Sequence, residues 1–191
     1  MQADAIEIDA AAMMRLREGD DLALNELMTR WQQPLTNYLT RLCNNEATAL
    51  DLAQETFVRI YESRARYDTR GKFAAWLYTI ARNLACNEHR RQKRHPALSL
   101  DVSTEETGRT HLPDTSLTPD SSAVQTEQAI AVRVAVAELP EDQRTAILLS
   151  EFDDCSHADI ATVLGCTPKA VEARLYRARQ TLREKLTRWL K

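Results

Sequence analysis

The stretch that decides the fold covers residues 156–171 and reads SHADIATVLGCTPKAV. Ser156 is suited to cap a short amphipathic helix, and Gly165 supplies the left-handed residue that ends it. Thr167 followed by Pro168 then caps and starts a second helix. Two helices joined by such a tight turn are how a helix-turn-helix that enters the major groove of DNA is built.

The second helix of this pair predicts a surface for duplex DNA. A helical wheel buries Val171, Leu175 and Ala178 and leaves another face outside. The outward and edge positions are Lys169, Glu172, Ala173, Tyr176, Arg177 and Gln180. Positive charge for phosphates comes from Arg174, Arg179, Arg183, Lys185 and Arg188. An ordinary helical hairpin with a solvated basic face remains the alternative interpretation.

Upstream of this stretch, apolar residues recur at helical spacing. The pattern predicts helices over 22–42, over 48–64 and from 73 to the basic run 90–94, with a short helix near 10–18. In the helix over 48–64, Leu50, Ala53, Phe57 and Ile60 share the predicted buried face. Periodicity stops at 95–122, where prolines lie among polar and acidic residues, and helical patterns resume near residue 123.

Composition supports an all-α fold and argues against some classes of function. The 191-residue chain has only 4 Gly and 6% aromatic residues, so Leu, Ala, Ile and Val must build a helical core. The net charge of −3 argues against a uniformly basic nucleic-acid binder. No signal or membrane-spanning stretch is found, which predicts a cytoplasmic protein without membrane insertion.

The cysteines are predicted to be buried free thiols. Cys43, Cys86, Cys155 and Cys166 are scattered, with no C-x-x-C pair and no regular histidine spacing nearby. We therefore expect no structural zinc, no other metal and no cofactor.

Two faces of the N-terminal helices predict binding. Asp51, Gln54, Glu55 and Val58 lie opposite the buried face of their helix, and an acidic face with an apolar centre suits a basic partner. A solvated charged face is an equally open reading.

The helix from residue 73 is expected to expose Tyr78 and Arg82, with Asn83 at the margin of its apolar stripe and Arg90 and Arg91 at its end. Aromatic, amide and basic side chains are what single-stranded DNA needs.

Four motifs together resemble the extracytoplasmic-function sigma factors of bacterial RNA polymerase. They are DLAQETF at 51–57, WLY at 76–78 with IARN at 80–83, LPEDQR at 139–144, and RLYRAR at 174–179. The resemblance covers nearly the whole chain in the right order. It implies an N-terminal domain that binds the polymerase clamp and melts the minus-ten element, and a C-terminal domain that reads the minus-thirty-five element.

The resemblance also implies roles for single residues. It makes Asp51, Gln54 and Glu55 clamp contacts, and Asn83 the acceptor of a flipped base beside the loop 68–72. The full minus-ten set is Tyr67, Phe73, Tyr78, Arg82, Asn83, Arg90 and Arg91. The minus-thirty-five set is Lys169, Glu172, Ala173, Tyr176, Arg177 and Arg179. Glu172 and Ala173 depart from the basic or hydroxyl residues of many relatives, so the promoter preference does not transfer.

The expected organisation is two small helical domains joined by a flexible linker. Residues 1–94 form sigma region 2, residues 95–122 the linker, and residues 123–191 sigma region 4 with its helix-turn-helix. The implied partners are core RNA polymerase, promoter DNA and an anti-sigma factor, and no catalytic residue is expected.

Two other functions remain open at this point. Asp51 and Glu55, one helical turn apart, fit a metal-dependent phosphohydrolase if further carboxylates or histidines converge on them. A transcription regulator that binds duplex DNA by itself is the second alternative, and it predicts tight specific binding without polymerase.

Overall fold

The computed structural model describes residues 2–69, 71–94, 119–153 and 155–187, and within these ranges every regular element is helical. The all-α fold class is confirmed. The N-terminal unit contains α1 (Gln2–Arg17), α2 (Leu22–Cys43), α3 (Glu46–Ser63), the short 3-10 helix η1 (Arg64–Arg66) and α4 (Phe73–Arg94). The C-terminal unit contains α5 (Pro119–Ala137), α6 (Glu141–Glu151), α7 (His157–Leu164) and α8 (Pro168–Lys185).

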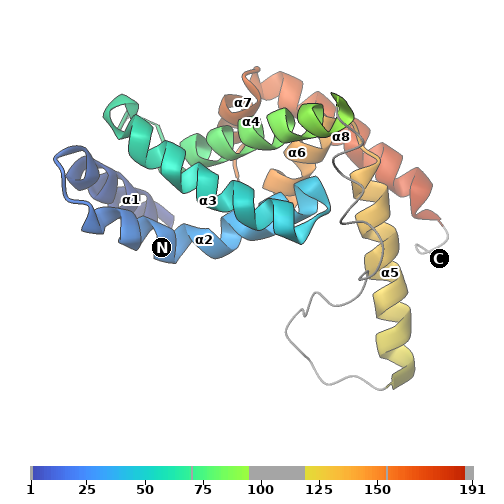
Figure 1. The fold of residues 1–191 in the computed structure, drawn as a ribbon. Helices are drawn as coiled ribbons and strands as arrows, with labels where there is room; N and C mark the ends of the chain where they lie inside the picture. Colours follow the sequence, from blue (N-terminus) through green and yellow to red (C-terminus); the bar gives the residue numbers. More distant parts are fainter. Residues whose placement is uncertain (1, 70, 95–118, 154, 188–191) are drawn as a thin grey trace.

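A tight turn pairs α2 with α3 (Figure 1). Asn44 ends α2 in the left-handed conformation, at φ 53°, which asparagine tolerates better than most residues. Asn45 then caps α3, because its side-chain oxygen accepts a hydrogen bond of 2.8 Å from the backbone N–H of Thr48. With so short a connection, the two helices pack side by side over their length.

Two expectations for the N-terminal helices are wrong in detail. The first helix begins at Gln2 rather than near residue 10, and it is fastened to α2 by buried Asp9, which accepts hydrogen bonds from Arg30 and from Trp31 Nε1. Leu50 is 43% exposed, because α3 buries Ala49 in its place. The other expected members of the buried face of α3 do lie in the core.

The helix-turn-helix expected from residues 156–171 is confirmed as α7 and α8. Ser156 forms a capping box with Asp159, and Gly165 ends α7 in the left-handed region at φ 60°. Thr167 accepts a hydrogen bond from the Ala170 N–H, and Pro168 occupies the first position of α8. The three residues expected on the inner face of α8 are buried.

Helix α5 begins at Pro119, so a helix occupies the end of the range 95–122 that the sequence assigns to the linker. Most of that range, residues 95–118, lies outside the described residues. Among the residues that are described, no helix is long and apolar enough to cross a membrane.

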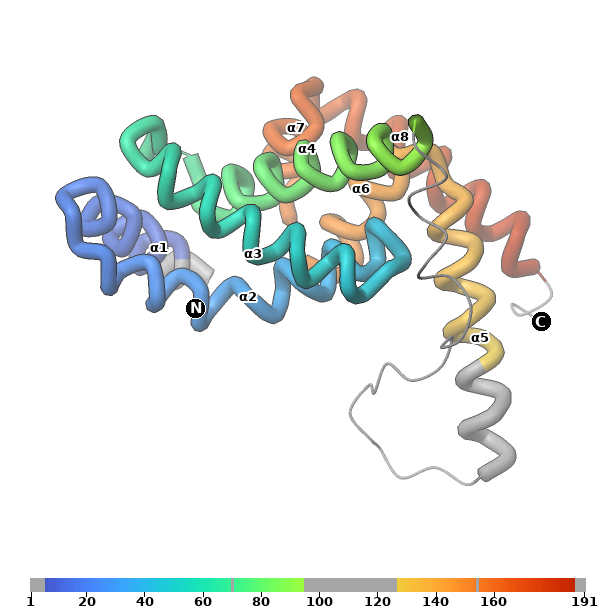
Figure 2. The backbone as a smooth tube through the Cα atoms, viewed as in Figure 1, coloured from blue at the N-terminus to red at the C-terminus, as the bar shows by residue number. Residues whose placement is uncertain are grey.

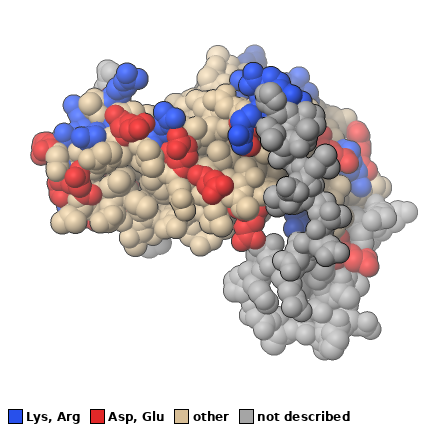
Figure 3. All heavy atoms as spheres, in the orientation of Figure 1, with Lys and Arg blue, Asp and Glu red and all other residues tan. Residues whose placement is uncertain are grey.

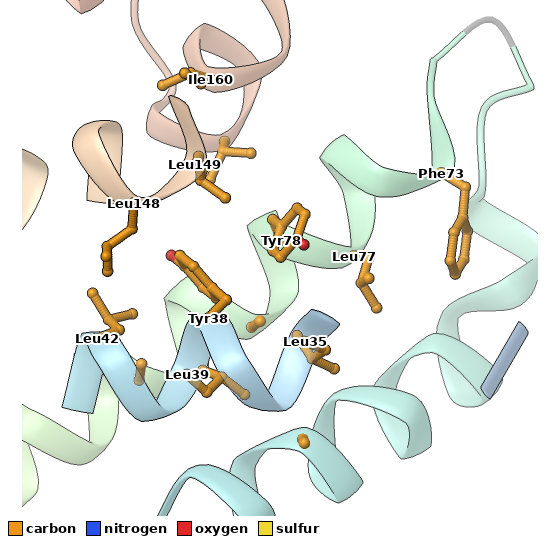
Figure 4. Close-up of a cluster of buried hydrophobic side chains, with 14 of the residues drawn as sticks. Leu35, Tyr38, Leu39, Leu42, Phe73, Leu77, Tyr78, Leu148, Leu149 and Ile160 are labelled. Atoms are coloured by element: carbon orange, nitrogen blue, oxygen red, sulfur yellow. The ribbon is translucent and has the colours of Figure 1, made fainter. Parts of the chain in front are cut away.

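The two units share one hydrophobic core (Figure 4). Figure 2 shows α4 running past α7, and α2 also contacts α6. Fully buried Tyr38 and Tyr78 lie where these helices meet, with their ring centroids 5.0 Å apart in an edge-to-face arrangement. Leu148 and Leu149 of α6 approach them from the other side. The C-terminal unit therefore covers one face of α4.

Candidate functional site

The outer surface of α3 brings together the residues expected to bind a protein partner. Asp51 and Gln54 are exposed, and Val58 is 50% exposed between them and the end of the helix. Glu55 is half-buried and accepts a hydrogen bond of 2.7 Å from Arg59 Nε, one turn away. Figure 3 shows acidic side chains along α3 on this side of the molecule. The structure forms the surface, while its binding role stays a prediction.

A cavity of about 450 Å³ opens between α3 and α4, and exposed Asn83 lines it. The lining residues are Arg59, Glu62, Ser63, Arg66, Ile80, Asn83, Leu84 and Asn87. Two arginines and two amides around a partly apolar floor suit an unpaired base and its phosphate, and the Glu62 carboxylate of the lining lies 3.5 Å from Arg59 Nη1. The sequence analysis missed Arg66 and Asn87. The spacing of Asn83 and Asn87, four residues apart on one helix, is the signal that points to the second amide.

Tyr67 and Phe73, expected to flank a base-binding loop, are buried at its two ends. They are 3% and 2% exposed, and the Tyr67 hydroxyl donates a hydrogen bond of 3.2 Å to the Gly71 carbonyl. Phe73 packs edge-on against Trp31 and Trp76. In this conformation the two rings hold the loop in place and offer no free face for stacking.

Tyr78 and Arg82 correct the prediction that α4 exposes them. Tyr78 is 1% exposed, and its hydroxyl donates a hydrogen bond of 2.7 Å to Asp153 Oδ1. Burial and the neighbouring Asp153 carboxylate raise the pKa of this hydroxyl. The Arg82 side chain is 17% exposed, and its Nη2 lies 2.7 Å from Asp142 Oδ1. The physical reason is that the C-terminal unit packs on this face of α4.

The end of α4 carries the expected positive charge. Arg90 and Arg91 are exposed, as are Lys93 and Arg94, and Figure 3 shows basic side chains gathered in this region. Arg91 pairs with Glu88 at 2.8 Å, one turn earlier. Since exposed ion pairs are weak, Arg91 stays available to a phosphate.

The outer face of α8 places all six predicted residues in solvent: Lys169, Glu172, Ala173, Tyr176, Arg177 and Arg179. Tyr176 is 70% exposed. Glu172 Oε1 lies 3.8 Å from His157 Nδ1 on α7, and Arg179 donates a hydrogen bond of 2.7 Å to Glu151. Arg174, counted with the phosphate-binding charges from the sequence, is instead held by Asp142.

Among the described residues, the carboxylates of α3 do not gain the converging ligands that a phosphohydrolase needs. Across the part of the chain that the structure describes, no group of three or more His, Cys, Asp or Glu side chains could hold a metal ion. None of the four cysteines is in a disulfide bond; Cys86 is buried, as expected, whereas Cys43, Cys155 and Cys166 are only half-buried.

Comparisons with known proteins agree with this geometry. Residues 27–95 match the family model for sigma-70 region 2, and residues 129–182 match the model for sigma-70 region 4. The chain is 34% identical over 182 residues to the ECF RNA polymerase sigma-E factor of Haemophilus influenzae, covering 93% of this chain and 95% of that protein. It is 33% identical over 180 residues to the RNA polymerase sigma-H factor of Pseudomonas aeruginosa, covering 92% of each chain.

Two solved structures have a similar fold. The structure of CnrH in complex with the cytosolic domain of CnrY aligns with a TM-score of 0.70 at 24% identity, covering 94% of this chain and 97% of CnrH. The sigma factor RpoE of Bartonella quintana, in complex with the anti-sigma factor NepR, aligns with a TM-score of 0.68 at 25% identity, covering 85% of this chain and 96% of RpoE.

Proposed function

The chain belongs to the extracytoplasmic-function sigma factors of the sigma-70 family, and from this premise we propose how its helices divide the work of transcription initiation. It binds core RNA polymerase and directs the enzyme to specific promoters. The observation that carries the division of work is the cavity beside Asn83, which lies between the proposed polymerase-binding helix and the basic end of α4.

Core polymerase binds the outer surface of α3. Asp51, Gln54 and Val58 are free to meet a basic helix with an apolar centre. Glu55 exchanges its ion pair with Arg59 for one with the partner, at little cost because the pair is half in solvent. Complementary charge of this kind speeds association and selects the partner.

The minus-ten element is melted at α4. An unpaired base enters the cavity and receives hydrogen bonds from Asn83, while Arg59 and Arg66 neutralise the adjoining phosphates. Arg90 and Arg91 bind the backbone at the end of the helix. Tyr67 and Phe73 fix the loop that borders the site.

The minus-thirty-five element is read by α8. The helix-turn-helix presents the exposed face of α8 to the major groove, where Lys169, Glu172 and Tyr176 reach base edges. Arg177 and Arg179 bind phosphates on either side of the groove.

The remaining assignments complete the proposal. Residues 1–94 act as region 2, residues 123–191 as region 4, and residues 95–122 as the linker between them. An anti-sigma factor controls the chain. The support for this is that the similar RpoE was solved in complex with the anti-sigma factor NepR. The protein works in the cytoplasm with the polymerase, without catalytic residue, metal or cofactor.

A paired substitution on α3 tests the polymerase surface. Gln54→Ala with Glu55→Lys should reduce affinity for core polymerase at least tenfold, because both residues face the partner. The free energy of unfolding should change by no more than about 0.5 kcal/mol, as for most exposed substitutions. Binding is measured by fluorescence anisotropy of labelled chain titrated with core enzyme.

The matched control is Gln180→Ala with Glu184→Lys, which makes the same chemical changes on the exposed surface of α8. This control should bind core polymerase like the unaltered chain. Equal affinities for both double variants would remove α3 as the polymerase surface.

A further inference from the structure

We propose that Glu62, in the last turn of α3, determines which bases the cavity beside Asn83 accepts. It selects cytosine and adenine, whose Watson–Crick edge carries an amino group next to a ring-nitrogen acceptor. It rejects thymine and guanine, whose edge carries a carbonyl oxygen next to a ring N–H. This inference rests on the proposed function, in which Asn83 captures an unpaired base, and it adds the chemical class of that base.

The polarity of the cavity lining points to this role. Of the described residues that line the cavity, Glu62 alone is acidic. The guanidinium groups of Arg59 and Arg66 can only donate hydrogen bonds, whereas an ionised carboxylate can only accept them. A carboxylate also repels phosphates, so Glu62 weakens the hold of the cavity on the DNA backbone. A base that donates a hydrogen bond to Glu62 offsets that loss.

The Glu62 carboxylate is held in place and still has room for a base. Its Oε2 lies 3.5 Å from Nη1 of Arg59, which stands one helical turn earlier and also donates to Glu55. A carboxylate offers about four lone-pair sites, so this single long contact leaves most of them for a ligand. The Glu62 side chain is 58% exposed, and an entering base can reach it.

Asn83 supplies the second contact from the opposite wall, on α4. Its amide nitrogen can donate to the ring nitrogen that lies next to the amino group in cytosine and adenine. By turning over, the same amide can instead present its oxygen to the ring N–H of thymine or guanine. Asn83 therefore captures a base without deciding between the two classes.

Glu62 makes that decision because its carboxylate cannot reverse its polarity. The amino group of cytosine or adenine donates to it. The carbonyl oxygen of thymine or guanine would instead face another acceptor, and neither oxygen would gain a hydrogen bond. A site that is built to accept from an amino group discriminates strongly against a base that lacks one at that position.

Bubble templates bound to holoenzyme test the selection. The full chain is mixed with core polymerase and a promoter that it recognises, whose unpaired strand carries cytosine or uracil in turn at each minus-ten position. Uracil has the thymine edge without the methyl group, so the pair exchanges only an amino group for a carbonyl and the matching ring proton. The position read in the cavity is the one at which Asn83→Ala removes the base preference.

At that position the unaltered holoenzyme should bind the cytosine template about tenfold more tightly than the uracil template. Glu62→Gln should reduce this ratio to about twofold or less, because a glutamine amide can donate to the uracil carbonyl as well as accept from the amino group. Adenine and hypoxanthine at the same position make the same exchange on a purine and should change in the same direction. Fluorescence anisotropy measures the affinities, and circular dichroism checks that helicity is kept.

The matched control is Glu88→Gln. Glu88 pairs with Arg91 three residues later on α4, as Glu62 pairs with Arg59 on α3, but it does not line the cavity. Loss of this acid near the DNA changes the affinity for all templates alike. The ratio between the cytosine and uracil templates should stay that of the unaltered chain.

The outcomes separate this inference from the proposed function. If Asn83→Ala removes the preference but Glu62→Gln keeps the original ratio, Glu62 does not read the base, and the proposed function stands. A uniform rise in affinity for all templates in Glu62→Gln also overturns the inference, because Glu62 would then act only as a charge near the backbone. Tighter binding of uracil by the unaltered chain overturns the class of base. If Asn83→Ala alters no preference at any position, the base cavity fails and this inference fails with it.

Discussion

Helices α4 and α8 both carry residues predicted to bind DNA, yet the structure exposes the two sets differently. On α8 all six predicted residues lie in solvent. On α4 and the loop before it, Asn83, Arg90 and Arg91 are exposed, Tyr67, Phe73 and Tyr78 are buried, and Arg82 is bound by Asp142. The predicted set on α8 is exposed as it stands, whereas α4 needs a rearrangement to expose all of its predicted set.

The difference comes from the range of the interactions that define each surface. The orientation of α8 follows from a turn and two caps within its own motif, beginning at Ser156. The free surface of α4 depends on residues from Asp142 onward, about 60 positions later in the chain. A helical wheel can predict a surface that depends on local residues, as on α8. It cannot predict which residues of α4 are covered by a distant part of the chain.

The largest expected effect distinguishes a buried tyrosine from an exposed one. Tyr78→Ala should lower the free energy of unfolding by about 3–5 kcal/mol, because it removes a ring packed against Trp31 and Tyr38. Tyr176→Ala should change it by no more than about 0.5 kcal/mol, since that ring is exposed. Urea unfolding followed by circular dichroism measures both. Similar values for the two variants would contradict the burial of the Tyr78 ring.

The next effect concerns strand opening at the exposed part of α4. Asn83→Ala should slow open-complex formation on duplex promoters, because base capture is worth about 1–3 kcal/mol. A template with a pre-melted bubble should be affected much less. Potassium permanganate reactivity of unpaired thymines measures opening on both templates.

Asn37→Ala is the control, because it changes an exposed amide on α2 outside the cavity. If Asn83→Ala impairs both templates equally, its role lies in folding or polymerase binding and not in capturing a base.

A smaller effect, limited to a few base pairs, tests which residues of α8 read bases and which bind phosphates. If Glu172 accepts from a cytosine amino group, Glu172→Ala should relax preference at one or two positions of the minus-thirty-five element, by about 1–3 kcal/mol there. Arg177→Ala should lower the affinity for all promoters alike, and should reduce the slope of log affinity against log salt concentration by about 1. Selection from randomised promoters measures both. An unaltered sequence preference for the Glu172 variant would leave only a surface contact with His157.

The smallest effect is the response of the α4 contact to alkaline pH. Burial and the hydrogen bond to Glu141 raise the pKa of Cys86 to about 11 from an ordinary value of 9.0. The neutral thiol therefore contributes stability that is complete below pH 9 and lost as pH rises toward 11. We expect a loss of about 1 kcal/mol or less, because solvent near Glu141 screens the interaction.

Measuring the free energy of unfolding at about pH 8 and at about pH 10.5 shows whether this stability is lost as the thiol ionises. Cys86→Ala should have a flatter profile than the unaltered chain, because it removes the thiol whose pKa is raised. A Cys86→Ala profile that matches the unaltered one would show that this thiol does not stabilise the contact.

The sequence alone predicts much of the fold because its signals are local. Ser156, Gly165 and Thr167 define the helix-turn-helix through backbone capping, and Ala53, Phe57 and Ile60 define the inner face of α3. Leu50 is misplaced because a wheel cannot distinguish it from Ala49 as the residue that continues the buried face. Tyr78 and Arg82 are misplaced because their partners belong to the other unit.

The proposed site divides in the same way. The exposed surface of α3 and the outer face of α8 follow from periodicity. The cavity beside Asn83 needs two helices at a definite distance, and its contributors Arg66 and Asn87 have no distinguishing sequence pattern of their own beyond spacing.

Reconstituted transcription tests most directly the central claim that the chain directs core polymerase to specific promoters. Purified core polymerase is mixed with a library of randomised promoters, with the chain or with its Gln54→Ala, Glu55→Lys variant, and RNA start sites are mapped. We predict that the chain gives starts downstream of one shared pair of minus-thirty-five and minus-ten elements, and that the variant does not. Starts that are the same with and without the chain, together with tight duplex binding by the chain alone, would contradict a sigma factor and indicate a self-sufficient DNA-binding regulator.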